Sequence, residues 1–116
     1  MQKEMQHLLN EKEVLLTLDC PFIVRLATCW QDPKLLYMLL EPCMGGELRT
    51  VMHSFPKNQI PERNARFYAA CIVLALRHMH ERDIVHRDLA PENLMVDDHG
   101  YIRLVDFGFS KVRPHT

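Results

Sequence analysis

Two short polar signatures near the carboxyl end constrain this chain more than any other feature. They are His86-Arg87-Asp88-Leu89-Ala90-Pro91-Glu92-Asn93 and Asp106-Phe107-Gly108. Asp88 could accept the proton of a substrate hydroxyl and orient it, and Asn93 and Asp106 offer the hard oxygen ligands that suit Mg²⁺. Phosphoryl transfer needs this help from a protein, namely a positioned nucleophile and cations on the phosphate oxygens. The two signatures therefore predict a site for magnesium-dependent phosphoryl transfer.

The residues around these signatures predict short strands. Ile84-Val85, Leu94–Val96 and Tyr101–Val105 are rich in β-branched and apolar residues. Asp97-Asp98-His99-Gly100 supplies turn chemistry between the last two. The candidate catalytic residues thus fall in loops at the ends of strands, where rigid scaffolds usually present functional groups.

The first part of the chain predicts an amphipathic helix over Gln2–Leu18, because leucines recur there at helical spacing. Glu11 lies on the apolar side of this helix, three residues after Leu8 and four before Leu15. A carboxylate beside buried apolar surface is costly unless a cation meets it. Periodicity leaves two possibilities open: Glu11 pairs with a cation, or it reaches water at the edge of the stripe.

A hairpin and a connector are predicted next. Ile23–Thr28 and Leu35–Leu40 read as antiparallel strands joined by the turn Gln31–Lys34, with the hairpin packed on the helix. The Pro and paired Gly of Glu41–Gly46 mark the clearest break in composition and predict a connector between two packed units. A short helix from Glu47 to about His53 follows.

The longest predicted helix opens at Ile60-Pro61, with Pro at its first position, and runs to about Glu81. Its middle, Ala69–Leu76, is apolar nearly all round. A helix of this kind is expected to be buried on most sides. Since few other elements of the chain remain to cover it, we expect an incomplete domain with marginal stability or a tendency to aggregate.

Composition excludes several functional classes. The net charge is −1, from 14 basic and 15 acidic residues, and the basic residues form no run, so neither nucleic acid nor an anionic membrane is an expected partner. No apolar run reaches the ~18 residues of a membrane span, and the start of the chain is too polar for a signal peptide. The cysteines show no CxxC spacing, which favours reduced thiols over a disulfide framework or zinc site. The cytoplasm is therefore the expected compartment.

With these signatures the chain resembles the eukaryotic protein kinases over essentially its whole length, and within them the AGC group. Tyr37–Leu48 and Leu104–Phe109 are particularly similar to cyclic-GMP-dependent protein kinases. The resemblance implies an α+β, two-lobed kinase-like fold in partial form, with residues 1–40 as the end of the small lobe, 41–46 as the hinge and 47–116 as the start of the large lobe. It also implies ATP and Mg²⁺ as cofactors and a protein substrate with a Ser or Thr acceptor, near basic residues. Regulation by cyclic nucleotides would act through domains upstream.

The resemblance assigns further residues to the nucleotide. Glu11 would pair with the Lys that positions ATP, and Arg87 would meet a phosphorylated residue of the activation loop. The remaining assignments are the gatekeeper Leu40, the hinge residues Glu41 and Cys43, Glu47 near the ribose, Met95 beneath adenine, the nucleotide contact Glu92, and the metal ligands Asn93 and Asp106. A stacked regulatory spine would comprise Leu15, Leu26, His86 and Phe107.

Two departures from the family pattern qualify the expected activity. Ala90 stands where serine/threonine kinases carry a Lys that contacts the transferred phosphate, and tyrosine kinases with Ala here have an Arg two positions on, where this chain has Glu92. The similarity also begins at the family's helix C, after the glycine-rich loop and the ATP-positioning Lys. We therefore expect the polypeptide alone to have no useful kinase activity. A pseudokinase or regulatory fragment is the alternative.

Overall fold

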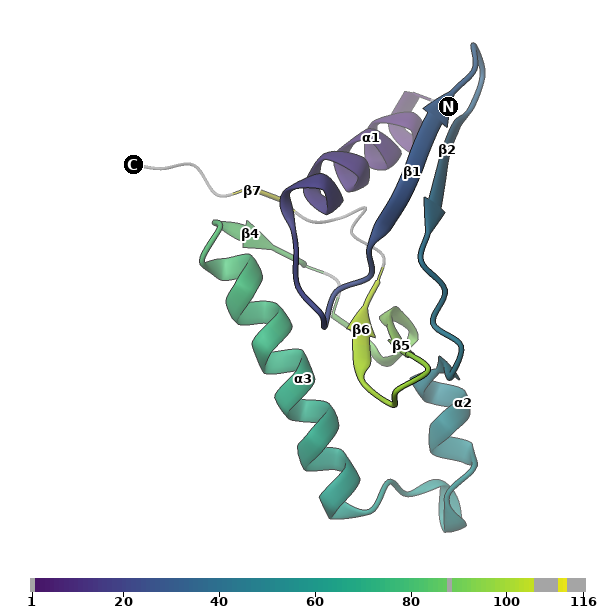
Figure 1. The fold of residues 1–116 in the computed structure, drawn as a ribbon, viewed down its shortest axis with the longest axis vertical. Helices are drawn as coiled ribbons and strands as arrows, with labels where there is room; N and C mark the ends of the chain where they lie inside the picture. The colour runs from purple at the N-terminus through teal and green to yellow at the C-terminus, as the bar shows by residue number, and fades with distance from the viewer. Residues whose placement is uncertain (1, 88, 106–110, 113–116) are drawn as a thin grey trace.

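The computed structural model describes residues 2–87, 89–105 and 111–112, and it arranges them as a helix with a hairpin next to a long helix with small sheets (Figure 1). The elements are α1 (Gln2–Thr17), β1 (Leu26–Gln31), β2 (Leu36–Leu40), β3 (Gly46–Glu47), α2 (Leu48–His53), η1 (Pro56–Asn58), α3 (Glu62–His80), β4 (Ile84–Val85), η2 (Pro91–Asn93), β5 (Leu94–Val96), β6 (Ile102–Leu104) and β7 (Lys111–Val112). No helix in this described part is long and apolar enough to cross a bilayer.

The predicted hairpin beside the first helix is confirmed, but its first strand and its turn lie further along the chain. β1 begins at Leu26, not Ile23, and pairs antiparallel with β2. The turn begins at Asp32, whose Oδ1 accepts the backbone N–H groups of Lys34 (2.8 Å) and Leu35 (2.6 Å). These hydrogen bonds lower the pKa of Asp32. Asp often begins a turn by making such side-chain contacts to the backbone. The turn therefore begins at Asp32, and Gln31 remains the last residue of β1.

The segment between α1 and the hairpin joins the first part of the chain to the second. Val24 N–H donates to the Leu104 carbonyl (3.0 Å), and Leu104 N–H donates to the Phe22 carbonyl (2.9 Å). Ile23 thereby forms a parallel bridge to β6 and is buried. This pairing explains why Ile23, although strand-like in sequence, does not belong to the hairpin.

The central sheet has the strand order β3-β5-β6. It links the connector Glu41–Gly46 to the hairpin of β5 and β6, whose turn is the predicted Asp97–Gly100. Gly45 N–H donates to the Val96 carbonyl (2.8 Å), and a Cβ at Gly45 would lie 2.8 Å from that oxygen. Only glycine allows this approach. Because Gly46 and Glu47 then pair with β5, the short helix begins at Leu48, one residue later than predicted. The strand predicted over Tyr101–Val105 is likewise shorter, since β6 covers Ile102–Leu104.

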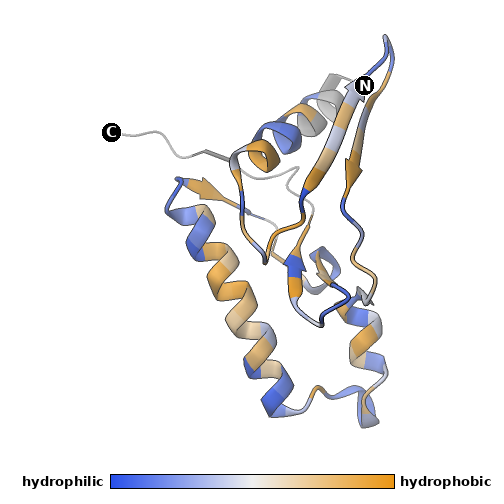
Figure 2. Cartoon of the chain, in the orientation of Figure 1, coloured by the Kyte–Doolittle hydropathy of each residue, from blue (hydrophilic) through white to orange (hydrophobic). Residues whose placement is uncertain are grey.

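The long helix α3 is buried on one face, and the prediction of burial on most sides is wrong for the described residues. Cys71, Ala75 and Met79 are buried, whereas Val73 is 61% exposed and Leu74 42%. β4 and β6 pack against the buried face. Figure 2 shows an apolar middle between hydrophilic ends. Pro61 precedes the helix as its N-cap and is not its first residue.

The core gathers residues from both parts of the chain. It combines the end of α1, the following segment, the buried face of α3 and the small strands; its buried members are Val14, Leu15, Cys20, Ile23, Val24, Leu48, Cys71, Ala75, Met79, Ile84, Leu94, Val96, Ile102 and Leu104. The pairing of β4 with β7 was not predicted.

A histidine on α3 holds the segment that follows α1. The Asp19 N–H donates to His78 Nε2 at 3.2 Å, so this nitrogen must be unprotonated. Burial lowers the pKa of His78, and the nearby Arg82 lowers it further, while Glu81 and Asp19 act in the opposite direction. The net lowering keeps the ring neutral at pH 7.

We therefore expect His78 to make the fold sensitive to mild acid. Its folded pKa lies below the unfolded value, so its contribution to the free energy of unfolding is complete above about pH 6.5 and is lost as the pH falls through the folded pKa. Urea titrations at pH 7.5 and 5.5 should show a smaller loss of stability for His78→Gln than for the natural chain. His80→Gln, on the exposed neighbouring histidine, is the control. An equal loss in all three chains would contradict the prediction.

Candidate active site

The two polar signatures meet at the backbone of Val105. His86 is 2% exposed and its Nε2 lies 3.1 Å from the Val105 carbonyl oxygen, and Val105 N–H donates to the Asn93 carbonyl at 2.9 Å. Both ends of the segment from His86 to Asn93 are thus bonded to the residue directly before Asp106. The predicted residues Asp88, Asp106 and Phe107 themselves lie outside the described residues.

The loop between these anchors has a constrained backbone. Arg87, an exposed side chain, adopts φ 68°, a left-handed conformation that costs a non-glycine residue about 1–3 kcal/mol and often marks functional loops. Ala90 is extended (φ −152°, ψ 157°), and its carbonyl accepts the Asn93 N–H at 2.9 Å. Glu92 is exposed within the single turn η2, whereas Asn93 is only 6% exposed.

The connector Glu41–Gly46 is only partly tied down by backbone hydrogen bonds. Glu41 N–H donates to the Arg25 carbonyl (2.9 Å), and the Cys43 carbonyl accepts Gly46 N–H (3.2 Å). Within the described residues, the Glu41 carbonyl and the Cys43 N–H have no hydrogen-bond partner. Burial raises the pKa of the Cys43 thiol, so it is protonated at neutral pH. The connector therefore offers one free backbone acceptor and one free backbone donor among the described residues.

Other predicted nucleotide contacts come together beside this connector. Glu47 and Met95 are direct partners across β3 and β5, with Glu47 exposed and Met95 half-buried. Leu40, at the end of β2, pairs with Leu26. The structure therefore places candidates that are far apart in sequence around one region.

Glu11 lies half-buried on α1, next to the buried Val14 and Leu15. It is neither fully buried nor fully solvent-exposed. Among the predicted spine residues, Leu15 belongs to the core and Leu26 packs against it, while His86 is anchored as described above.

Asp97 organises the turn of the β5–β6 hairpin, and from the sequence it was identified only as a turn residue. It is 5% exposed; its Oδ1 accepts the N–H groups of His99 and Tyr101 (both 2.9 Å), and its Oδ2 meets Arg103 Nε at 3.2 Å. Burial by itself raises the pKa of Asp97, but these hydrogen bonds and the Arg103 charge outweigh it and lower the pKa. The position of Asp97 at the start of the Asp-Asp-His-Gly turn could have indicated its role from the sequence. The role of Val105 could not have been found in this way, because Val105 acts through its backbone.

Comparisons with known proteins identify the family. A family described as protein kinase domain matches residues 1–116. A Drosophila melanogaster cGMP-dependent protein kinase, isozyme 2 forms cD5/T2, is 46% identical over 109 residues, covering 94% of this chain and 12% of that protein. A Dictyostelium discoideum cAMP-dependent protein kinase catalytic subunit is 47% identical, covering 94% and 16%. Human cGMP-dependent protein kinase 2 is 43% identical, covering 94% and 14%.

The chain belongs to the protein kinase family. The predicted similarity to cyclic-GMP-dependent serine/threonine kinases of the AGC group is confirmed. The chain spans less than a fifth of the length of these relatives.

Proposed function

We propose that this chain forms part of a kinase domain that transfers a phosphoryl group from ATP to Ser or Thr hydroxyls of proteins, with Mg²⁺. The observation that carries the proposal is the double anchoring of Val105 by His86 and Asn93. It joins His86 and Asn93, which flank Asp88 in the sequence, to the residue that precedes Asp106 in the sequence. A base and two metal ligands need this proximity to act on one phosphate.

Each residue has a role in this proposal. Asp88 accepts the proton of the substrate hydroxyl and orients its oxygen. Asn93 and Asp106 would hold Mg²⁺, which supplies positive charge to the phosphate oxygens. Arg87 would bind a phosphorylated residue of the activation loop.

The nucleotide would lie between the connector and β5. The Glu41 carbonyl and the Cys43 N–H would bind adenine between Leu40 and Met95. Glu47 would contact the ribose, Glu92 would contribute from η2, and Glu11 would pair with the Lys that positions ATP. Residues 1–40, 41–46 and 47–116 would then form the small-lobe end, the hinge and the start of the large lobe.

The relatives' names suggest the wider setting. The Drosophila and human proteins are called cGMP-dependent, so we infer control by a cyclic nucleotide through other domains. A cytoplasmic location for this protein, and a protein substrate with basic residues near its Ser or Thr acceptor, complete the proposal. The 116-residue chain alone is expected to lack useful activity.

A pseudokinase is the second candidate, and Ala90 favours it. The loop that carries Asp88 lacks a cation at position 90 and has an acid at Glu92. Such a protein would bind nucleotide or a partner without transferring phosphate.

A chimera separates the two candidates. Residues 1–116 would replace the matching segment of human cGMP-dependent protein kinase 2, and transfer of radioactive phosphate from ATP to a basic serine peptide would be measured with and without Mg²⁺. We expect Mg²⁺-dependent transfer that Asp88→Asn lowers by about 10³-fold or more. Asp98→Asn, in the exposed turn, should leave transfer unchanged. A folded chimera whose transfer ignores Asp88→Asn, or that stays inactive with Ala90→Lys, would overturn the proposal.

A further inference from the structure

A surface hollow lies between the first half of α3 and the turn of the β5–β6 hairpin. It has a volume of about 550 Å³ and is lined by Arg63, Asn64, Phe67, Tyr68, His99 and Gly100. A second hollow of about 250 Å³ adjoins it through the shared Arg63 and is also lined by Glu62 and Arg66. We call the two together the α3 hollow.

Phe67 and Tyr68 form the aromatic wall of the α3 hollow, and the Tyr101 ring adjoins that of Phe67. The Phe67 ring lies 6.0 Å from that of Tyr68 and 5.3 Å from that of Tyr101, and Tyr101 lies 6.0 Å from Phe22. Phe67 and Tyr101 are each 42% exposed. Neighbouring rings in this range support one another, so the wall is a preformed apolar platform. Exposed aromatic side chains beside a hollow are typical anchors of protein interfaces.

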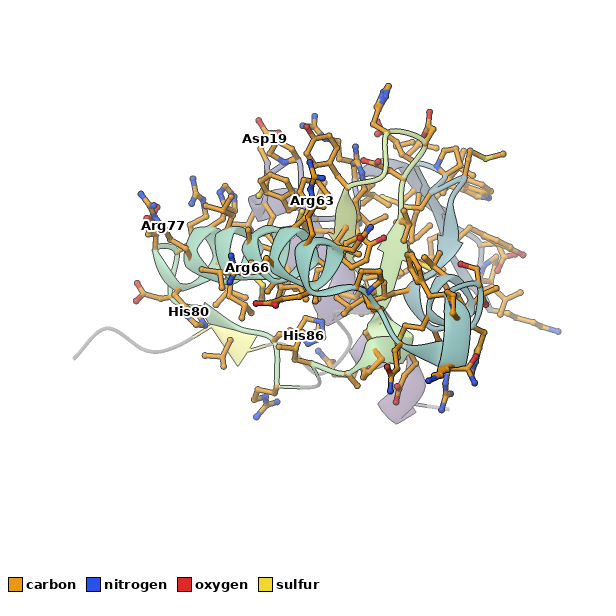
Figure 3. All side chains as sticks on the ribbon, turned by 90° about the horizontal axis from the view of Figure 1, so that it is seen from below. Asp19, Arg63, Arg66, Arg77, His80 and His86 are labelled. Atoms are coloured by element: carbon orange, nitrogen blue, oxygen red, sulfur yellow. The ribbon has the colours of Figure 1, made fainter. Side chains whose placement is uncertain are left out.

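The charges at the α3 hollow are mainly positive. Arg63 and Arg66 project from the first half of α3 (Figure 3). Arg66 is neutralised by Glu62, with 2.9 Å between Nη2 and Oε1. Arg63 has no carboxylate partner in the part of the chain that the structure describes. No carboxylate lines the larger hollow, so the charge it offers a partner is the Arg63 guanidinium, with an imidazole beside it.

The α3 hollow is separate from the candidate active site. His99 and Gly100 lie in the turn of the hairpin, whereas Asn93 and Val105 lie at its open end. Strands of three residues hold these ends roughly 10 Å apart. A bound segment would therefore leave the catalytic loop accessible.

We propose that the α3 hollow is a docking site for an acidic peptide segment of a partner protein, with a Phe or Leu side chain as its anchor. The anchor packs on the wall formed by Phe67 and Tyr68, and neighbouring carboxylates meet Arg63. Charge complementarity selects the acidic partner, and the aromatic wall supplies most of the affinity. The proposal does not depend on phosphoryl transfer.

The test uses the 116-residue chain and a fluorescein-labelled peptide, Glu-Glu-Asp-Phe-Glu-Glu-Leu, in fluorescence anisotropy titrations. We expect saturable binding that weakens with added NaCl. Arg63→Glu and Phe67→Ser should each weaken it about 10-fold or more. Arg49→Glu, an exposed Arg on α2, and Val73→Ser, an exposed site on α3 outside the hollow, are the matched controls and should change it less than about 2-fold.

Other outcomes overturn the proposal. Binding that is absent, that Arg63→Glu leaves unchanged, or that a peptide with Lys in place of every acid reproduces, would exclude an acidic-peptide site. Analytical sedimentation of the chain tests whether a second copy of the chain, and not a peptide, binds in the hollow. If the chain forms a dimer that Arg63→Glu dissociates and the peptide fails to compete, the hollow binds a second copy of the chain.

Discussion

Ala90→Lys should raise kcat for phosphoryl transfer by about 10²–10³-fold in the chimera described above, because one preorganised charge on a reacting oxyanion is worth this much. The Ala90 carbonyl is bonded to the Asn93 N–H at 2.9 Å, so a lysine here would extend from a position fixed relative to a proposed metal ligand. Since the contact is stronger in the transition state than with bound ATP, kcat should change more than KM. Initial rates over a range of ATP concentrations measure both.

Two further variants isolate the charge. Ala90→Met has similar length without the cation and should give no gain. Glu92→Arg tests a cation placed two residues on, in the same turn η2, and should recover part of the rate. If Ala90→Lys leaves kcat unchanged in an active chimera, a cation from another part of the domain already fills this role.

Asp97→Ala should destabilise the chain by about 3–5 kcal/mol, the usual cost of removing one partner from a buried charged pair. The carboxylate accepts two backbone N–H groups and the Arg103 Nε. Arg103 Nη1 is buried and has no hydrogen-bond partner within the described residues. Without Asp97, the Arg103 guanidinium would also lose the negative charge that it contacts through Nε. Urea unfolding at pH 7 measures the change in the free energy of unfolding.

Controls distinguish this role from a general effect of the turn. Asp98→Ala, at the exposed neighbour, should change stability by less than about 0.5 kcal/mol. Asp97→Ala with Arg103→Leu should cost less than the sum of the single changes, and Asp97→Asn gives a folded variant if Asp97→Ala does not fold. A loss for Asp97→Ala no larger than for Asp98→Ala would contradict the prediction.

The Asp97 carboxylate should also make the free energy of unfolding depend on pH in the acid range. Because the folded pKa of Asp97 is lowered from its ordinary 3.8, its contribution is complete above that value and is lost as the pH falls through the folded pKa. The difference in stability between the natural chain and Asp97→Asn should therefore shrink as the pH falls below 3.8.

Sequence predicted the elements well where local chemistry decides them. The first helix is confirmed to within one residue, since it ends at Thr17, and the turn after Val96 lies where Asp97–Gly100 was expected. The predictions were wrong where contacts with residues distant in the sequence determine the structure. Ile23 has strand propensity but pairs with Leu104, and Leu74 is as apolar as a core residue but lies on the face of α3 that the described elements leave open.

The candidate site also has features that the sequence predicted and features that only the tertiary structure revealed. The two signatures, His86 to Asn93 and Asp106 to Gly108, by themselves predicted the family and the chemistry to expect, because both motifs in this order rarely occur by chance. Only the tertiary structure decided that Glu47 pairs with Met95, that His78 holds the Asp19 backbone, and that Arg63 lies with His99 at one hollow. Backbone propensity and turn chemistry act over a few residues, whereas contacts across a chain depend on which apolar faces bury each other, and no short stretch of sequence records that choice.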